Sequence, residues 1–301
     1  MISLTTRSAI ESEITKRRLP ADFYSTVERW YVPLAQHIHD CYRQQGQTLL
    51  ISFNGAQGSG KSTLTAFLTL ILDRQFDLFS VEISIDDFYL TRAERKKLAQ
   101  QVHPLLATRG VPGTHDVALA RETLSCLRHC NAQNPCHLPR FDKSVDDRVS
   151  PDGWIKINRP VKVILFEGWC NNAPVQSDEE LEQPVNELER DEDGAGTWRS
   201  YANTQLALYH RELFDQADMK VLLEAPGFEK VYEWRGLQEK KLAQDTSGNH
   251  QGVMNEAQLK RFIQHYERIT RHALKWLPQS SHVVITLDDN HAISAMNMKA
   301  C

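Results

Sequence analysis

A glycine-rich segment at residues 54–63 carries the most specific chemical signal in the chain. Its letters, NGAQGSGKST, match the phosphate-loop pattern G-x-x-x-x-G-K-[ST] at every defined position. Glycines let backbone N–H groups converge on an anion, and the helix that starts here adds partial positive charge. In this pattern the lysine reaches the β- and γ-phosphates, and the serine hydroxyl completes a Mg²⁺ shell. The expected nucleotide contacts are Gly55, Ala56, Gln57, Gly58, Ser59, Gly60, Lys61, Ser62 and Thr63.

Carboxylates follow two further apolar segments. Asp86 and Asp87 come directly after the alternating segment 80–85, and Glu167 ends the buried run 161–166. Open α/β sheets place their ligands at the carboxyl ends of strands. There, Asp86 can take a proton from a substrate hydroxyl, and Glu167 can hold Mg²⁺ together with Ser62. A helix cap is the alternative for the aspartate pair, although capping needs only one residue and Asp87 or Thr91 could supply it. For Glu167, the alternative is a strand-end carboxylate that caps a helix or faces solvent.

Cationic side chains cluster in three polar segments. Arg109 and His115 lie in a turn-rich stretch, and Lys143 and Arg148 lie in a charged one. All four are candidates for binding an anionic acceptor, although surface loops and solvated charge runs carry such residues as well. Arg235 lies in a charged segment that is typical of a mobile lid, where it could stabilise the transferring phosphoryl group. An ordinary exposed helix is the alternative for that segment.

These side chains need a sheet and helices to position them. Short apolar or alternating runs predict strands at residues 49–53, 80–85, 161–166, 219–224 and 282–287. Helical periodicity predicts helices at residues 22–45, 64–72, 94–101, 117–129, 203–214, 228–243 and 255–276, with an interruption at Pro33. Alternating strands and helices indicate a parallel sheet covered on both faces, in a three-layer α/β/α arrangement.

Composition narrows the class of protein. The chain has 301 residues, 41% of them hydrophobic, and a net charge of −4, which argues against nucleic-acid binding. It shows no span for a membrane and no secretory signal. The six cysteines are expected to be reduced, as in the cytoplasm; Cys126, Cys130 and Cys136 with two nearby histidines fit no standard zinc pattern. We expect a small-molecule substrate, and the sequence leaves the oligomeric state open.

Two classes of nucleotide-dependent protein remain. A small-molecule kinase needs a base carboxylate and an acceptor pocket beside the phosphates, whereas a GTPase or motor ATPase uses water. The chain contains no N-K-x-D sequence, which would specify guanine. The Asp86 carboxylate and the polar segments favour the kinase.

Four motifs taken together resemble the D-glycerate 3-kinase family, which includes a plant photorespiratory enzyme, fungal ATP-binding relatives and bacterial kinase-like homologues. They are IDDFY at 85–89, RGVPGTHD at 109–116, PRFDKS at 139–144 and FEGW at 166–169. The resemblance extends over residues 49–287. More distantly, the chain is similar to the pantothenate kinase, uridine kinase and phosphoribulokinase group. In that group, the aspartate that matches Asp86 is the base and the carboxylate that matches Glu167 serves Mg²⁺.

The resemblance implies a P-loop fold with a five-stranded, mostly parallel sheet and a helical lid. It also implies transfer of the γ-phosphoryl of MgATP to a hydroxyl of a small carboxylate-bearing acceptor, with D-glycerate as the first candidate. A pantothenate-, nucleoside- or sugar-phosphate-like acceptor, or an ATPase without an acceptor, is the alternative. The catalytic candidates are Lys61, Asp86 and Arg235; the metal candidates are Ser62 and Glu167; and the acceptor candidates are Asp87, Tyr89, Arg109, His115, Lys143 and Arg148.

We expect residues 1–301 to form a single domain, with a helical extension at residues 1–47. Residues 177–196 contain nine acidic side chains and one arginine, a net charge of −8. Such a block buries little apolar surface, so the composition predicts a flexible loop without a role in the site.

Overall fold

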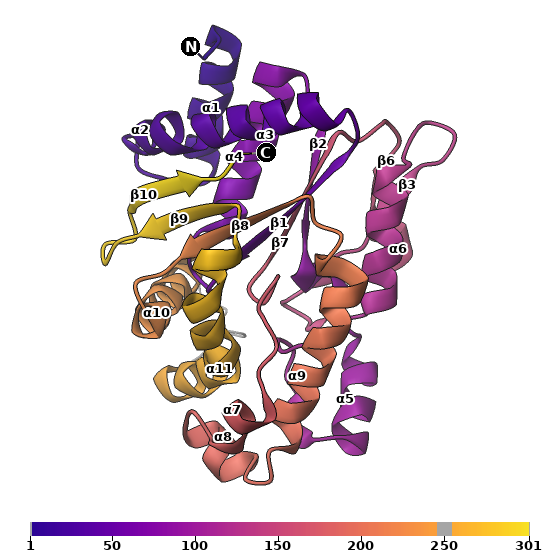
Figure 1. Cartoon of the computed structure of the whole chain (residues 1–301), viewed down its shortest axis with the longest axis vertical. Coiled ribbons are helices and arrows are strands. Elements are labelled where there is room, and N and C mark those ends of the chain that lie inside the picture. The colour runs from indigo at the N-terminus through magenta and orange to yellow at the C-terminus, as the bar shows by residue number, and fades with distance from the viewer. Residues whose placement is uncertain (1, 246–254, 301) are drawn as a thin grey trace.

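A six-stranded sheet in the order β10-β9-β8-β1-β7-β2 forms the centre of the protein (Figure 1). The computed structural model describes residues 2–245 and 255–300. All five predicted strands are present and parallel: β1 (Leu49–Gly55), β2 (Ser80–Ser84), β7 (Val163–Gly168), β8 (Met219–Glu224) and β9 (Val283–Leu287). The sequence does not predict the sixth strand, β10 (Ile293–Met298), which pairs antiparallel with β9. Its side chains are half-buried or exposed, so the apolar alternation is weak.

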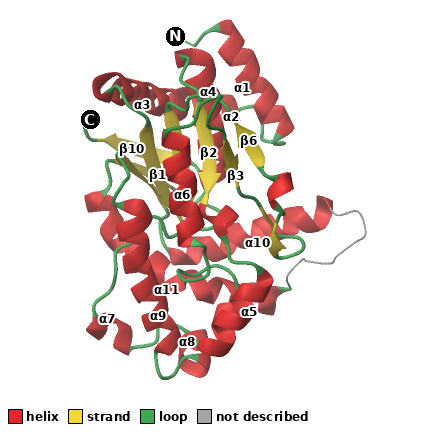
Figure 2. Cartoon of the chain, turned by 90° about the vertical axis from the view of Figure 1, so that its right-hand side faces the viewer, coloured by secondary structure: helices red, strands yellow, loops and turns green. Residues whose placement is uncertain are grey.

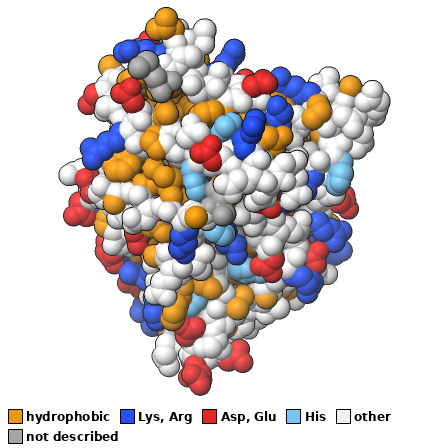
Figure 3. Space-filling view, turned by 45° about the horizontal axis from the view of Figure 1, so that its top comes forward, with side chains coloured by type: hydrophobic (Ala, Val, Ile, Leu, Met, Phe, Trp, Pro, Cys, Tyr) orange, Lys and Arg blue, Asp and Glu red, His pale blue; other side chains and the backbone are white. Residues whose placement is uncertain are grey.

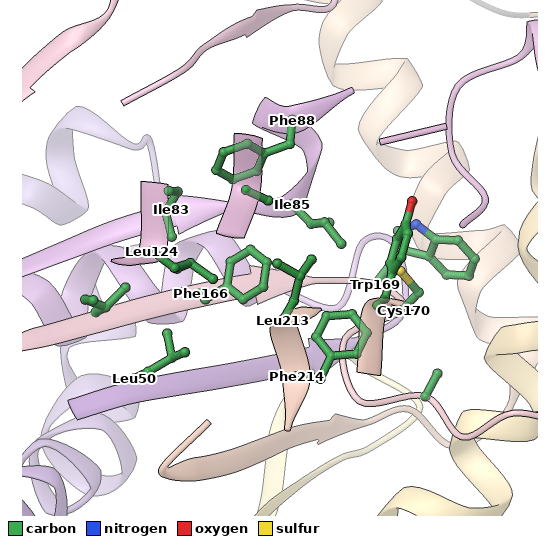
Figure 4. Close-up of a cluster of buried hydrophobic side chains, with 14 of the residues drawn as sticks. Leu50, Ile83, Ile85, Phe88, Leu124, Phe166, Trp169, Cys170, Leu213 and Phe214 are labelled. Carbon is green, nitrogen blue, oxygen red and sulfur yellow. The ribbon is translucent and has the colours of Figure 1, made fainter. Parts of the chain in front are cut away.

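The sheet separates two hydrophobic cores. Along β7, Val163 and Leu165 belong to one core while Ile164 and Phe166 belong to the other, as the alternation of a strand requires. Figure 4 shows Phe166 packed with Leu124 and Leu213 in the second core. Helices cover the first face: α1 (Leu4–Lys16), α3 (Val32–Gln45) and α4 (Lys61–Phe76). Others cover the second: α6 (Val117–Arg128), α9 (Thr197–Tyr209), η5 (His210–Phe214) and α11 (Glu256–Ser280). The predicted three-layer α/β/α architecture is confirmed.

The N-terminal segment packs on α4. It consists of α1, the short α2 (Phe23–Thr26), a π-helical turn η1 (Val27–Tyr31) and α3. The interruption that Pro33 predicts is this π-helical turn, because α3 begins at Val32 and places the proline in its first turn. The chain remains helical through this turn, where the Val32 N–H bonds to the Val27 carbonyl oxygen, and the wider turn accommodates a residue that has no N–H to donate.

Helices also gather below the sheet, at the carboxyl ends of its parallel strands (Figure 2). They include α5 (Arg92–Gln101), η3 (Pro104–Ala107) and α10 (Phe228–Asp245), which contacts α11. Two small hairpins lie between α6 and β7 in the sequence: β3 (Cys136–Leu138) with β6 (Ile155–Ile157), and β4 (Phe141–Asp142) with β5 (Asp147–Arg148). Short elements complete this part of the chain: η2 (Ile85–Phe88) and η4 (Pro151–Gly153).

The acidic segment 177–196 is not a flexible loop, and this corrects the prediction from composition. It forms α7 (Asp178–Glu182) and α8 (Glu187–Glu192), both packed among the neighbouring helices. Buried arginines from other helices neutralise its buried acids. Arg268 of α11 pairs with Glu189 at 2.6 Å, and Arg199 of α9 pairs with Asp193 at 3.1 Å.

The cysteines do not gather into a metal site: within residues 2–245 and 255–300, no group of histidines, cysteines and carboxylates is arranged to hold a metal ion. Cys126, Cys130, Cys136 and Cys170 are free thiols. Cys41 is disulfide-bonded, which corrects the expectation that this thiol is reduced; Cys301 lies outside the described residues.

In the described part of the chain, every helix is too short or too polar to cross a bilayer. Charged side chains of both signs are interspersed over the face seen in Figure 3.

Candidate active site

The phosphate loop connects the end of β1 to the start of α4. Gly58 and Gly60 have positive φ angles of 79° and 91°, which glycine adopts without strain. A Cβ atom on Gly58 would also lie only 2.9 Å from Cβ of Trp234 on α10, so this helix packs closely on the loop. The Lys61 ammonium donates to the carbonyl oxygens of Gly55 and Ala56, at 2.7 and 3.0 Å. Burial lowers its pKa, against the opposing effect of nearby carboxylates.

The predicted carboxylates meet the loop because three neighbouring parallel strands end at one edge of the sheet. Glu167 ends β7, next to β1, and Asp86 follows β2, on the other side of β7. The Ser62 hydroxyl donates to Oε1 of Glu167 at 3.1 Å. A serine hydroxyl and a carboxylate are both oxygen ligands of the kind that Mg²⁺ prefers.

Asp86 is held by two partners. The Tyr89 hydroxyl donates to its Oδ1 at 2.9 Å, and the Lys143 ammonium donates to its Oδ2 at 2.6 Å. Burial alone would raise the pKa of Asp86, but the charge and hydrogen bond of Lys143, together with smaller contributions from His115 and Tyr89, outweigh burial and lower this pKa to about 2. The carboxylate is therefore ionised at neutral pH.

These groups line one cavity of about 330 Å³, which we call the polar cavity. Its wall includes most of the predicted catalytic, metal and acceptor residues, together with aromatic side chains. The lining residues are Gln57, Gly58, Lys61, Ser62, Asp86, Tyr89, Arg109, Lys143, Glu167, Trp169, Arg235, Phe262 and Tyr266. Gln57 Oε1 is buried without a hydrogen-bond partner, as expected of a group that awaits a ligand.

Arg109 reaches the polar cavity because its backbone is fixed from two sides. The Tyr266 hydroxyl donates to the Arg109 carbonyl oxygen at 3.2 Å, and the Trp169 indole donates to the Gly110 carbonyl oxygen at 3.1 Å. Gly110 has φ 147°, and a Cβ atom there would lie 2.4 Å from the Tyr266 hydroxyl. The Arg109 guanidinium pairs with Asp146 at the tip of the β4–β5 hairpin.

The opposite wall comes from α10 and α11. Arg235 of α10 lies in the polar cavity, with its guanidinium carbon 5.8 Å from the centre of the Phe262 ring. The helical spacing in the sequence predicts that Phe262 and Tyr266 lie on the core face of their helix. It does not predict that both side chains line the polar cavity. No feature of the sequence distinguishes an aromatic side chain in a core from one that borders a ligand site.

Three predicted acceptor residues do not line the polar cavity. Asp87 accepts the Phe141 N–H at 3.2 Å and so ties β4 to η2. Arg148 donates to the Tyr89 carbonyl oxygen at 3.0 Å and pairs with Asp116 at 3.2 Å. His115 is buried behind Tyr89, with ring centres 4.4 Å apart. All three hold the segments that carry Asp86, Tyr89 and Lys143.

The His115 environment predicts a loss of stability in acid. Its Nδ1 lies 2.9 Å from the Tyr209 hydroxyl, and its Nε2 is buried without a partner. Burial lowers the His115 pKa from 6.5 to about 4. Because the unfolded chain takes up this proton below about pH 6.5 and the folded chain does not, stability falls as pH decreases from 7 to 5, by about 2 kcal/mol for this group.

Replacing His115 by asparagine should remove its contribution to the pH dependence of stability. The asparagine amide can still contact Tyr209 but does not titrate between pH 5 and pH 7. We expect the drop in unfolding free energy between pH 7 and pH 5, measured by urea denaturation, to be about 2 kcal/mol smaller in His115→Asn than in the wild type. An unchanged drop would mean that the folded protein protonates His115 readily.

A second cavity of about 390 Å³, which we call the apolar cavity, lies on the other side of the phosphate loop. The loop contributes Gly58, Ser59, Gly60 and Thr63 to its wall, and aromatic side chains from distant parts of the sequence complete it. These are Phe23 and Tyr31 from the N-terminal segment, Trp234 from α10 and His291 from the β9–β10 turn. The Trp234 and His291 rings lie 4.4 Å apart.

Comparisons with known proteins agree with this geometry. No protein-family model matches the chain. The chain is 32% identical to the uncharacterized kinase mug58 of Schizosaccharomyces pombe over 232 residues, which cover 74% of this chain and 80% of that protein. It is 29% identical to the chloroplastic D-glycerate 3-kinase of Arabidopsis thaliana over 225 residues, 72% of this chain but 46% of that protein.

A solved structure of D-glycerate 3-kinase from Cryptococcus neoformans matches with a TM-score of 0.75 and 25% identity, covering 91% of this chain and 99% of that one. The similarity in sequence and the similarity in fold therefore both point to kinases, as do the phosphate loop and the carboxylates of the polar cavity. The chain belongs to the D-glycerate 3-kinase-like family of P-loop kinases.

Proposed function

We propose that this kinase transfers the γ-phosphoryl of MgATP to a hydroxyl of a small carboxylate-bearing acceptor, most closely D-glycerate. One observation carries the proposal: a carboxylate, Asp86, shares the polar cavity with the phosphate loop and with two cations, Lys143 and Arg109. A kinase needs the carboxylate for the acceptor hydroxyl, and the additional cations suit an acceptor that is itself an anion. The D-glycerate 3-kinases among the similar proteins support this choice of acceptor.

The phosphates of ATP would lie against the backbone of residues 55–63. Lys61 is held on two loop carbonyls and is well placed to exchange them for phosphate oxygens. Ser62 and Glu167 fit a magnesium ion, because they offer two adjacent oxygen ligands and Mg²⁺ usually takes its others from phosphates and water. When bound, this ion neutralises charge that develops on the phosphate oxygens.

The apolar cavity is the natural place for the nucleotide base. It adjoins Gly60 and Thr63 and contains the paired rings of Trp234 and His291, which offer a surface for stacking. Its described lining contains no Asp or Glu side chain, and a carboxylate is the usual acceptor for the N–H donors of guanine. We therefore expect ATP to be preferred over GTP.

In the transfer step, Asp86 accepts the proton of the acceptor hydroxyl as the hydroxyl oxygen bonds to the γ-phosphorus. The bond from that phosphorus to the bridging oxygen breaks, and its electrons leave with ADP. Lys61 and Arg235, on opposite walls of the polar cavity, offset the negative charge of the transferring group. Tyr89 fixes the orientation of Asp86 through its hydrogen bond to Oδ1.

The test is release of the nucleoside diphosphate, ADP from ATP or GDP from GTP, by the purified protein with Mg²⁺ and a panel of acceptors. The panel contains D-glycerate, L-glycerate, pantothenate, uridine and ribulose 5-phosphate. We expect ADP release to depend on D-glycerate, with phosphoglycerate as the product and ATP as the better donor. Turnover with uridine alone would refute a carboxylate-bearing acceptor, and ATP hydrolysis unaffected by every acceptor would refute the kinase reaction itself.

A further inference from the structure

Both oxygens of the proposed base, Asp86, accept a hydrogen bond from another side chain of the protein. Tyr89 occupies Oδ1 of Asp86, and Lys143 occupies Oδ2 at 2.6 Å in a charged pair. A carboxylate that is bonded to an ammonium group is a weak proton acceptor, because taking a second proton would break the pair. Asp86 therefore has to exchange Lys143 for the acceptor hydroxyl before it can act.

Lys143 can leave Asp86 while its hairpin stays in place. It lies in the turn between β4 and β5, and its side chain is 59% exposed. The base of the hairpin is tied down, since Asp87 accepts the Phe141 N–H at 3.2 Å and Arg148 donates to the Tyr89 carbonyl oxygen at 3.0 Å. Only the flexible lysine stem has to rotate.

An anionic acceptor supplies what Lys143 needs in exchange. Arg109 and Lys143 line the same cavity, so the acceptor carboxylate would lie between two cations. Asp146 holds the Arg109 guanidinium in place, while Lys143 rotates to meet the acceptor. Water or a neutral alcohol brings a hydroxyl but no second anion, and neither can separate Lys143 from Asp86.

We propose that Lys143 is a cap on Asp86, and that the carboxylate of the acceptor removes this cap by pairing with Lys143. The inference rests on the proposed function and adds a selection step to it: a compound without a carboxylate can enter the polar cavity but meets an inactive base. The cap would also suppress ATP hydrolysis while the acceptor is absent, because water cannot release Asp86.

The experiment compares ADP release without an acceptor, with glycerol and with D-glycerate. Glycerol keeps the hydroxyl groups of D-glycerate and lacks its carboxylate. Lys143→Met removes the charge and keeps the stem length, and Lys143→Arg keeps the charge. The control is Lys260→Met, because Lys260 forms a comparable ion pair with Glu187 on α8, at 3.0 Å and with 58% of its side chain exposed.

We expect Lys143→Met to raise both acceptor-free hydrolysis and glycerol turnover about tenfold or more, while it raises the KM for D-glycerate. Lys143→Arg should reverse most of this rise because it restores the charge, and Lys260→Met should keep both background rates low. If Lys143→Met only raises the KM for D-glycerate, Lys143 merely binds the acceptor, and the cap is refuted while the proposed function stands. If the wild type uses glycerol as fast as D-glycerate, the cap and the preference for a carboxylate are both refuted.

Discussion

Replacing Asp86 by asparagine is expected to lower kcat about 1000-fold while it leaves ATP affinity nearly unchanged. Asparagine keeps the oxygen that accepts the Tyr89 hydroxyl, but it cannot accept a proton from the acceptor. General base catalysis of this kind contributes about 100- to 10,000-fold. The kcat is measured by D-glycerate-dependent ADP release, and the Kd for ATP is measured by calorimetry on the same protein.

Asp87→Asn is the matched control, because Asp87 is the adjacent carboxylate and does not line the polar cavity. Its contact to the Phe141 N–H needs only an oxygen, which asparagine retains. We expect its kcat to change less than about threefold, as for a substitution outside the reacting groups. Equal losses of kcat in the two variants, or a similar loss of ATP affinity in Asp86→Asn, would remove Asp86 from the role of base.

Strand order explains why the sequence predicts the centre of the site. The phosphate loop and Asp86 each follow a strand and Glu167 lies at the end of one, and parallel neighbours end at one edge of a sheet. Adjacency of the three groups therefore follows once the strands are recognised. The antiparallel β10 is missed because an edge strand that buries little has no need of apolar alternation.

Side-chain direction is what the sequence cannot provide. Arg109 and His115 lie six positions apart in one turn-rich segment, yet Arg109 borders the polar cavity and His115 is buried behind Tyr89. Contacts from distant segments decide this: Tyr266 and Trp169 fix the backbone of residues 109 and 110, and Tyr209 holds the His115 ring. A linear pattern of residue types contains no information about such contacts.

The composition of the acidic segment 177–196 likewise does not reveal which residues its side chains contact in the fold. Its net charge predicts disorder only if its acids have no partners elsewhere in the fold, but several of them pair with α9 or α11 and two of those pairs are buried. Glu189 and Asp193 pair with Arg268 and Arg199, which belong to other helices. Charge averaged over a window of sequence cannot detect partners that the fold supplies, so composition predicts a loop where the structure has two ordered acidic helices.

Breaking the ion pair between Glu189 and Arg268 is therefore expected to lower the free energy of unfolding substantially. Their side chains are 0% and 6% exposed, and Arg268 also donates to the backbone of the acidic segment, at the Glu180 carbonyl oxygen. Glu189→Gln leaves a buried guanidinium without its counter-charge. Removing one partner of a buried pair typically costs about 3–5 kcal/mol, and we expect about 3 kcal/mol here because the amide keeps one hydrogen-bond acceptor.

Glu192→Gln is the matched control, since Glu192 lies on the same short helix and pairs at 2.6 Å with Arg261, two turns before Arg268 on α11. That pair is exposed, 43% for Glu192 and 48% for Arg261, so its loss should cost less than about 1 kcal/mol. Urea denaturation of both variants measures the difference. Equal unfolding free energies for the two variants would show that burial of the Glu189 pair does not stabilise the acidic segment against α11, and order in α7 and α8 would then have to come from their apolar contacts alone.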